Sequence, residues 1–444
     1  MSFFKKLKSI FFIAFNFLFS KNSGPSNARK SMIGAVFCIA LSILPLLVVL
    51  IVCDGMIEGM TNRIVSLSSY DLQVVLASSN LNLDEYEAAS KLILEVPNVK
   101  SSVVERQGMA LAGSRNARAG AMIRGVDVDL YEKNESFRKY LKVLDGNFDL
   151  SAKNSAVIGE KLASELNLKV GDTLRIISSS ESNGKTHPRF ASFKVKGIVS
   201  SGYQELDAHW IFIPIKTAFD LFSTSSSRII IGVETTCPFD YELFEIQKEI
   251  NHHLRQESSL QPTIYTWKNI NSSKFENFAS TKLLLVLIMS IIVLVSSVNV
   301  ASSIVMLIME KKKEIAILKS FGTSNSDIIF IFLLIAFFIA FLGILFGVPL
   351  GILCSVNANS IIAFLEKAIN VVILFGMNLV GQGEKFSAVS VLNPEYYLQS
   401  IPLVLPFGEI FAISVLVLIL SVLVSLVPSI KAGREKPVSI FRKF

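Results

Sequence analysis

Four long apolar runs without a single Asp, Glu, Lys or Arg constrain this chain more than any other feature. They occupy residues 32–53, 283–309, 328–354 and 410–427. A helix needs about 20 apolar residues to cross a bilayer, and in lipid its backbone polar groups must be paired within the segment. We therefore predict four transmembrane helices, at residues 32–53, 281–309, 328–354 and 409–428. The composition agrees, because 51% of the residues are hydrophobic and only 18% are charged.

The basic residues predict the orientation of these helices. They cluster before the first run, between the second and third runs, and after the fourth. With four crossings, all three clusters fall on one side, and Lys and Arg concentrate on the cytoplasmic side. We therefore expect both termini in the cytoplasm and residues 54–280 and 355–408 outside. Residues 54–278 hold 25 basic and 28 acidic residues, so the net charge of +7 arises from the segments beside the spans. The positive charge therefore indicates membrane orientation, and we predict no nucleic-acid partner.

Two further apolar stretches need a separate interpretation. Residues 368–380 are flanked by charged residues and are too few to span a bilayer, so we predict a helix or hairpin on the outer surface. Residues 1–31 predict an elbow helix in the cytoplasmic interface, with Phe4, Leu7, Phe11 and Phe15 in lipid. A signal peptide cleaved near Ala28 is the alternative interpretation.

The segment 54–280 has the pattern of a folded α+β domain. Strand patterns at 71–77 and 99–104 flank a helix pattern at 83–95, and strands at 228–234 and 262–266 flank a helix at 240–256. These two units predict a ferredoxin-like split βαβ subdomain. The strand-rich residues between them, about 110–227, predict an inserted β-rich subdomain whose helix at 160–168 is closed by Gly171. The expected fold class is a four-helix membrane protein with a large extracytoplasmic α+β domain.

No motif in the sequence predicts catalysis or metal binding. The chain has no GxxxxGK[ST] phosphate loop, so we expect it to hold no ATP itself. Its four cysteines show no CxxC spacing, and the adjacent His252 and His253 lack a carboxylate at metal-ligand spacing. We predict no catalytic residue, no metal site and no cofactor bound by this chain.

Residues 310–327, EKKKEIAILKSFGTSNSD, form the most informative segment between two runs. A helix starting at Glu310 would place Ile315, Leu318 and, nearby, Ile317 and Phe321 in an apolar ridge beside lysines. Gly322 suits the helix stop, and the segment from Ser324 to Asp327 predicts a capping box for the next helix. The segment is either a charged turn between spans or a helix that binds a cytoplasmic protein. The apolar ridge favours the second interpretation.

The segment MEKKKEIAILKSFGTS resembles the link between the second and third spans in permeases of the FtsX/MacB superfamily of ABC transporters. The resemblance extends over nearly the whole chain and narrows to the lipoprotein-releasing permeases of the LolC/LolE type. It includes FIAFNFLFSK near the start, VIGEKLASELNLKVGDTLRI and GIVSSGYQELDAHWIFIPIKTAFDLF in the middle, and LVPSIKAGREKPVSIFRKF at the end.

The resemblance implies a set of partners and a coupling site. Two such permeases pair around two copies of a separate, LolD-like ATPase, which binds ATP and Mg²⁺. The complex pulls lipoproteins from the outer leaflet of the inner membrane and passes them to a LolA-like periplasmic carrier, so membrane lipid is also a partner. The family's coupling helix, which docks on the ATPase, corresponds here to residues Glu314, Ile315, Ala316, Ile317, Leu318, Lys319, Phe321 and Gly322.

Two further sets of residues are candidates for contacts. Gly343, Gly347 and Gly351 form a small-xxx-small face on the third run, which predicts close helix packing. Residues 178–192 correspond to the hairpin that one permease type of this family uses as a hook for the carrier. Here they form either a plain hairpin turn or a reduced hook led by Pro188, Arg189 and Phe190.

Two other functions remain alternatives at this point. A mechanotransmission permease of the same superfamily would act on a periplasmic or cell-wall partner without moving lipid. A membrane-anchored scaffold would have no ATPase. The absence of ionisable residues from the spans argues against a proton- or ion-coupled transporter.

Overall fold

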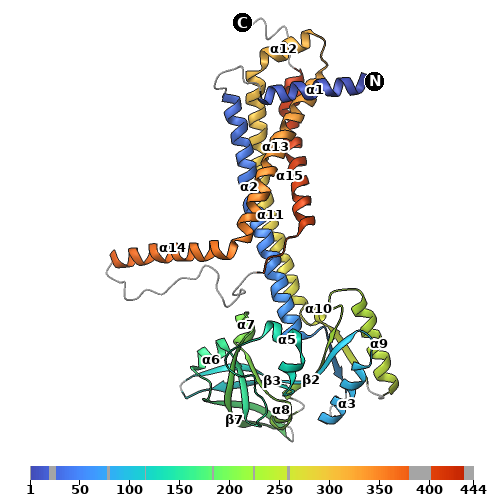
Figure 1. Cartoon of the computed structure of the whole chain (residues 1–444), viewed down its shortest axis with the longest axis vertical. Helices are drawn as coiled ribbons and strands as arrows, with labels where there is room; N and C mark the ends of the chain where they lie inside the picture. The colour runs from blue at the N-terminus through green and yellow to red at the C-terminus, as the bar shows by residue number, and fades with distance from the viewer. Residues whose placement is uncertain are drawn as a thin grey trace. The chain divides into compact units, whose positions relative to one another are not determined.

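The computed structural model describes residues 2–19, 27–77, 81–115, 117–182, 185–223, 226–257, 261–379 and 402–434. The chain divides into two compact units (Figure 1). One, the helical unit, comprises Met1–Gly55, Phe278–Lys367 and Leu403–Phe444. The other comprises Met56–Asn277 and Ala368–Pro402, and its residues 56–277 are called the sheet domain.

Each predicted transmembrane run lies within one long helix. The helices are α2 (Asn27–Ile64), α11 (Ser272–Glu310), α13 (Asn325–Val356) and α15 (Phe407–Arg434). All four are longer than the apolar runs, because polar residues at both ends extend them. A short helix, α12 (Lys312–Ser320), joins α11 to α13. Apolar side chains of α2, α11, α13 and α15 form one continuous core.

Contacts at one end of the helical unit show how these helices run. The hydroxyls of Ser31 in α2 and Ser303 in α11 lie 3.0 Å apart, so the start of α2 meets the end of α11. The start of α13 meets the end of α15, because a Cβ placed on Gly433 would lie 3.0 Å from the main-chain oxygen of Asn325. Within each of these pairs the helices are therefore antiparallel. Among the described residues, Lys30 near the start of α2, Lys311 after α11 and Lys431 near the end of α15 lie at this end.

A fifth helix, α14 (Ala358–Leu379), corrects the expectation for residues 368–380. That apolar run is only the second half of a helix that starts ten residues earlier, one residue after α13 ends. By length and composition, residues Ala358–Phe375 are also a candidate membrane span, although their mean hydropathy of 1.7 is well below the 2.8–3.3 of the other four helices. Among the described residues, five helices are therefore long and apolar enough to cross a membrane.

The N-terminal helix α1 (Ser2–Phe19) packs on the helical unit along one face. Ile10 and Ala14 are buried, whereas Phe11 and Phe15 are each 49% exposed. The exposed pair agrees with the predicted interfacial face, although the ring of Phe11 also lies 5.5 Å from that of Phe338. The side chains of Phe4 and Leu7, which were predicted to share this face, lie outside the described residues.

The sheet domain is built on one 10-stranded sheet. Its strands are β1 (Leu72–Leu76), β2 (Val99–Gly113), β3 (Arg118–Val126), β4 (Lys142–Gly146), β5 (Ser155–Gly159), β6 (Thr173–Ser182), β7 (Lys185–Ser200), β8 (Trp210–Pro214), β9 (Ser227–Thr235) and β10 (Pro262–Thr266). The order along the sheet is β10-β1-β9-β2-β3-β8-β5-β7-β4, and β6 pairs with β2 and β7. Helices α3 (Leu83–Leu94) and α9 (Glu242–Glu257) share a core with β1, β2 and β9.

The remaining helical segments of this domain are short. They are the π-helical turn η1 (Val65–Ser69), α4 (Leu130–Lys133), α5 (Glu135–Tyr140), α6 (Glu160–Leu166), α7 (Gln204–Asp207), α8 (Ile215–Leu221) and α10 (Trp267–Ile270). Helix α6 ends at Asn167, which adopts the left-handed conformation, rather than at Gly171 as predicted. Asn tolerates that conformation because its short polar side chain bonds locally.

The sequence predicted two βαβ-like units and a separate inserted subdomain. The two units interleave, since β9 lies between β1 and β2, with antiparallel pairing throughout. The inserted strands, however, continue the same sheet through β2, which pairs with β9, β3 and β6. The 15-residue length of β2 makes this possible, whereas only its first six residues were predicted as strand.

A fully buried ion pair lies at the centre of the sheet domain. The Arg124 guanidinium donates two hydrogen bonds to the Glu105 carboxylate, at 2.5 and 2.8 Å, and a third to the main-chain oxygen of Leu67. The Tyr70 hydroxyl donates to the same carboxylate at 2.8 Å. Burial lowers the pKa of Arg124, but Glu105 and Tyr70 together raise it, so the pKa lies above its usual value. The pair thus connects η1 to β2 and β3.

Candidate functional site

The segment predicted to meet an ATPase folds as a short helix with defined ends. After α11, Lys311 leaves helical geometry and α12 follows over Lys312–Ser320. Gly322 stops the helix with a φ of +90°, a conformation that favours glycine. The Ser324 hydroxyl accepts a hydrogen bond from the Asp327 N–H at 3.2 Å, and the Asp327 carboxylate accepts one from the Ser324 N–H at 3.3 Å. The glycine stop and the capping box are confirmed.

One face of α12 is anchored to the helical unit. Ile315 is 2% exposed and Ala316 is fully buried, and Ile315 belongs to the common core. The Lys319 ammonium donates a hydrogen bond of 2.7 Å to the main-chain oxygen of Gly433 near the end of α15. α12 is therefore fixed both to the core of the helical unit and to the end of α15.

Charged groups connect the α11–α12 joint to its neighbours. The Lys311 ammonium lies 3.0 Å from the carboxylate of Glu314, three residues further along the chain. It also lies 5.8 Å from the centre of the Phe17 ring in α1. The Glu310 carboxylate accepts a hydrogen bond of 3.1 Å from the Ala28 N–H at the start of α2. The joint thus contacts two other helices through polar groups.

The opposite face of α12 is exposed and apolar. Ile317 is 47% exposed and Phe321 is 86% exposed, and their spacing of four residues places them on the same side. The predicted ridge is wrong in one respect, because Ile315 faces the core and Leu318 is half-buried. The sequence pattern predicted a single apolar face. In the structure, α12 has one buried apolar face with Ile315 and one exposed apolar face with Ile317 and Phe321, and packing against the helical unit determines which face is buried. Ile317 and Phe321 form the exposed pair of α12.

The three glycines of α13 all face α2. A Cβ on Gly343 would lie 2.6 Å from a side-chain carbon of Ile39, and one on Gly351 would lie 2.9 Å from Leu47. At Gly347 the obstacle is backbone, since the Cα of Ala40 would be 2.9 Å away. The two helices run in the same direction along this seam, and the absence of side chains lets their backbones approach closely.

We expect the Gly347→Ala variant to be less thermally stable than the native protein. Its new Cβ would meet the backbone of Ala40, and overpacking of this kind costs about 1–3 kcal/mol. Gly34→Ala in α2 is the matched control, because its Cβ would meet nothing within 4 Å and it gains the same helix propensity. The fraction that stays monodisperse after heating in detergent measures both. Equal stability of the two variants would contradict close packing along this seam.

At the end of the helical unit away from α12, one lysine bridges three helices. The Lys282 ammonium in α11 lies 2.6 Å from the Asp54 carboxylate in α2 and 2.9 Å from that of Glu409 in α15. None of the three was predicted as a site residue. Each directly flanks a charge-free run, and that position is the sequence signal that identifies them. The cluster holds α2, α11 and α15 together where they leave the apolar region.

The candidate hook is part of a regular β-hairpin. β6 and β7 pair without interruption from Thr173 opposite Lys194 to Ser182 opposite Lys185. Pro188, Arg189 and Phe190 lie on β7 within this ladder. Arg189 donates to the main-chain oxygen of Asp220, and Phe190 is 74% exposed. Phe190 is thus an exposed aromatic side chain on the second strand of the hairpin, and contact of Pro188, Arg189 and Phe190 with a carrier stays a prediction.

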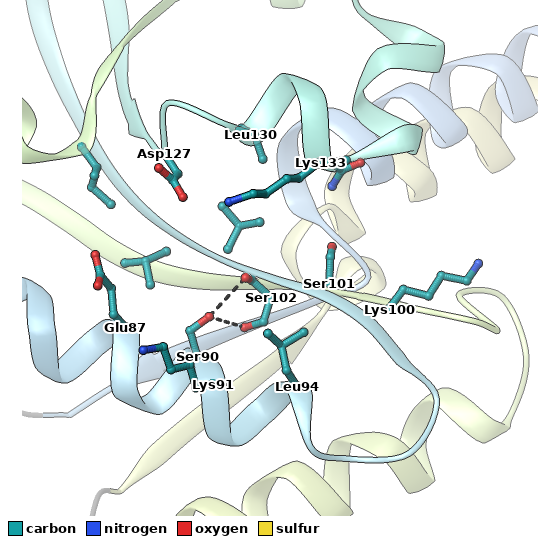
Figure 2. Close-up of a pocket in the computed structure, with 14 residues that line it drawn as sticks. Glu87, Ser90, Lys91, Leu94, Lys100, Ser101, Ser102, Asp127, Leu130 and Lys133 are labelled. Atoms are coloured by element: carbon teal, nitrogen blue, oxygen red, sulfur yellow. Dashed lines mark hydrogen bonds between the residues drawn. The ribbon is translucent and has the colours of Figure 1, made fainter. Parts of the chain in front are cut away.

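An open pocket of about 480 Å³ lies in the sheet domain beside α3 and β2 (Figure 2). Side chains of both charges line it, including Glu87, Asp127 and Lys133, and Figure 2 shows the Ser90 hydroxyl bonded to Ser102 at its floor. Among the described residues, no group of three or more His, Cys, Asp or Glu side chains is placed to hold a metal ion. The pocket has no arrangement of groups that indicates catalysis.

Two family models match consecutive parts of the chain. Residues 32–237 match the MacB-like periplasmic core domain, and residues 286–437 match the FtsX-like permease C-terminal family. The first match covers α2 and most of the sheet domain, and the second covers most of α11 and all of α12, α13, α14 and α15.

Several curated proteins are similar over almost their whole length. The lipoprotein-releasing system transmembrane protein LolC of Xylella fastidiosa is 22% identical over 416 residues, which cover 92% of each chain. LolC of Neisseria meningitidis is 24% identical over 91% of this chain and 92% of its own. The corresponding protein LolE of Haemophilus influenzae is 22% identical over 97% of this chain and 98% of its own.

Proposed function

This chain is a permease of the FtsX/MacB superfamily, of the LolC/LolE type, and on that premise we propose that it extracts lipoproteins from the outer leaflet of the inner membrane. It is a multi-pass subunit of an ABC system for lipoprotein release, and it hands its cargo to a periplasmic carrier. The observation that carries the proposal is the similarity to LolC and LolE proteins along more than 90% of both chains. We assign ATP and Mg²⁺ to a separate, LolD-like ATPase and catalysis to no residue of this chain.

The energetics of the cargo explain what the permease must provide. Three acyl chains of about 16 carbons, at about 0.8 kcal/mol per CH₂, cost on the order of 40 kcal/mol to expose to water. Extraction therefore requires an apolar path in the membrane and a sheltered transfer to the carrier. The charge-free spans supply apolar surface, and α11 exposes a broad face of it, including Leu287, Ile291, Leu294 and Val298. We propose that this face meets the lipoprotein and the second permease subunit.

We further propose four spans with both termini in the cytoplasm. The support is geometric, because the starts of α2 and α13 and the ends of α11 and α15 lie together beside the basic clusters. Lys282, Asp54 and Glu409 mark the other end of α2, α11 and α15. The hairpin around Phe190 and the carrier are then on the same side of the membrane.

Cysteine labelling tests this topology. In a variant whose four cysteines are replaced by alanine, Ala152→Cys in the sheet domain should react with a membrane-impermeant maleimide in intact cells. Ser326→Cys, at the exposed start of α13, should react only after the membrane is permeabilised. Both positions are exposed, so a difference in labelling reports sidedness alone. Labelling of Ser326→Cys in intact cells would refute four spans in this orientation.

Photo-crosslinking tests lipoprotein extraction. A photoreactive residue at Val298 or Val295, both exposed on α11, should capture lipoprotein in the membrane, and ATP should lower the yield as cargo is expelled. Leu345, equally exposed on α13, is the matched control that should capture much less. Absence of capture along α11 and α2, with ATP hydrolysis intact, would favour a mechanotransmission permease instead.

A further inference from the structure

Helix α14 has two sharply different sides. Between Ala358 and Phe375 its polar residues are Asn359, Ser360, Glu366, Lys367 and Asn370. At 3.6 residues per turn these five fall within an arc of about 120°. Leu374 is the large apolar residue that shares this arc. The remaining apolar side chains, among them Ile361, Phe364, Leu365, Val371, Val372 and Phe375, cover the opposite side.

The apolar side of α14 carries large and uncovered side chains. Phe364 and Val372 are each 70% exposed, Phe375 is 67% exposed and Val371 is 66% exposed. The described part of the chain packs nothing over them. Contiguous apolar surface of this kind marks a contact with a membrane or another protein.

The connection that contains α14 leaves and re-enters the helical unit at the same end. α13 runs parallel to α2, with Gly351 on Leu47, so its last residues lie near the level of Asp54. α15 begins at that same level, because Glu409 and Asp54 share Lys282. If α14 crossed the bilayer once, residues 380–406 would have to cross back, yet they contain Glu384, Lys385 and Glu395.

A crossing would also place Glu366 and Lys367 near the middle of the bilayer. Each charge there costs about 2.5–3.5 kcal/mol on insertion scales. None of the four long apolar runs carries such a residue. The charge pattern of α14 therefore belongs to a helix that lies along the membrane surface.

Continuity with the surface of α13 identifies lipid as the covering material. The final turns of α13 expose Phe346, Leu350, Leu353 and Val356, which follow one another along a single stripe. After the one-residue joint at Asn357, exposed apolar side chains resume in α14. Lipid that surrounds the stripe on α13 therefore lies within one helical turn of the apolar side of α14, which begins at Ile361 after the exposed Asn357, Asn359 and Ser360.

We propose that α14 lies in the plane of the membrane–water interface, with its Phe364 and Val372 side in the acyl region and its Glu366 and Asn370 side toward water. An amphipathic helix of this type sinks its apolar face about 5–10 Å into the headgroup boundary. It fixes the depth at which α13 ends and α15 begins. That the leaflet is the outer one rests on the proposed topology, whereas the interfacial placement does not.

Spin labels on the full-length protein test the placement. In the variant with its four cysteines replaced by alanine, labels are attached at Phe364→Cys and Val372→Cys, with Lys367→Cys and Asn370→Cys as matched controls on the same helix. The protein is reconstituted in vesicles of phosphatidylethanolamine and phosphatidylglycerol. Accessibility to oxygen, which concentrates in lipid, is compared with accessibility to a water-soluble nickel chelate.

We expect mobile labels with high oxygen and low nickel accessibility at Phe364 and Val372, and the reverse at Lys367 and Asn370. Depths should alternate with the helix period. A lipid signal at all four positions, with depth increasing along the chain, would show a span and overturn the proposal. Immobile labels shielded from both reagents at Phe364 and Val372 would show a protein partner, and nickel access at all four would show a helix in water. Each of these results also overturns it, without bearing on lipoprotein release.

Discussion

Replacing Arg124 by Met should destabilise the sheet domain by about 3–5 kcal/mol, the usual cost of leaving one partner of a buried ion pair unpaired. Glu105 would keep the hydrogen bonds from Tyr70 and Gln107 but lose two from the guanidinium, and the main-chain oxygen of Leu67 would lose its donor. The Met side chain fills much of the same volume as Arg. The loss of stability therefore arises mainly from the Glu105 carboxylate, which is left buried without its ion-pair partner, rather than from a cavity.

Tryptophan fluorescence during urea unfolding measures this effect in the full-length protein. The chain has two tryptophans, Trp210 and Trp267, and both lie in the sheet domain, so the signal reports that domain. The Arg124 guanidinium carbon lies 4.7 Å from the centre of the Trp210 ring. Trp267 directly follows β10, the edge strand of the sheet, and so reports a part of the domain away from the ion pair.

Two variants make the interpretation specific. Arg118→Met changes an exposed arginine on the same strand and should leave the unfolding midpoint nearly unchanged. Adding Glu105→Leu to Arg124→Met removes the stranded charge and should recover part of the loss. A loss below about 1 kcal/mol for Arg124→Met alone would mean that water or a shifted side chain compensates the carboxylate.

The double variant Ile317→Asp, Phe321→Asp should abolish binding of the ATPase while the permease still inserts. If this exposed pair docks in an apolar groove, two unpaired carboxylates buried there cost several kcal/mol, and 3 kcal/mol already corresponds to about a hundredfold loss of affinity. Both side chains are exposed in the permease, so its own fold should tolerate the change. The measurements are co-purification of the ATPase and its stimulated ATP hydrolysis.

Whether an added carboxylate prevents ATPase binding should depend on where it lies in or near α12. Ser326→Asp adds a carboxylate just beyond α12, in the first turn of α13, where an acidic residue is favourable, and should leave binding intact. Ile315→Asp should instead reduce the yield of folded permease, because Ile315 is buried in the helical unit. Normal co-purification of the Ile317 and Phe321 double variant would show that the ATPase docks elsewhere.

The helices, strands and turns that depend only on neighbouring residues could be predicted from the sequence. A charge-free run of more than 20 residues must pair its backbone within itself, and each of the first three runs lies inside one helix, α2, α11 or α13. Short runs of strand-favouring residues located β1, β9 and β10. Gly322 and the capping box at Ser324 located the joint between α12 and α13. Each of these signals needs only a few neighbouring residues.

Tertiary structure alone decided which surfaces are covered. Arg124 lies in a strand whose sequence is partly polar. It is buried because β2 places Gln107 opposite it and Glu105 diagonally beside it. Ile315 and Ile317 are equally apolar, yet Ile315 packs in the core of the helical unit and Ile317 is exposed, since that core covers only one face of α12. α14 looked like a short surface run until its start at Ala358 revealed a two-sided helix. Local patterns determine where a segment can become a helix or strand, whereas burial depends on partners far away in the chain, which the pattern does not contain.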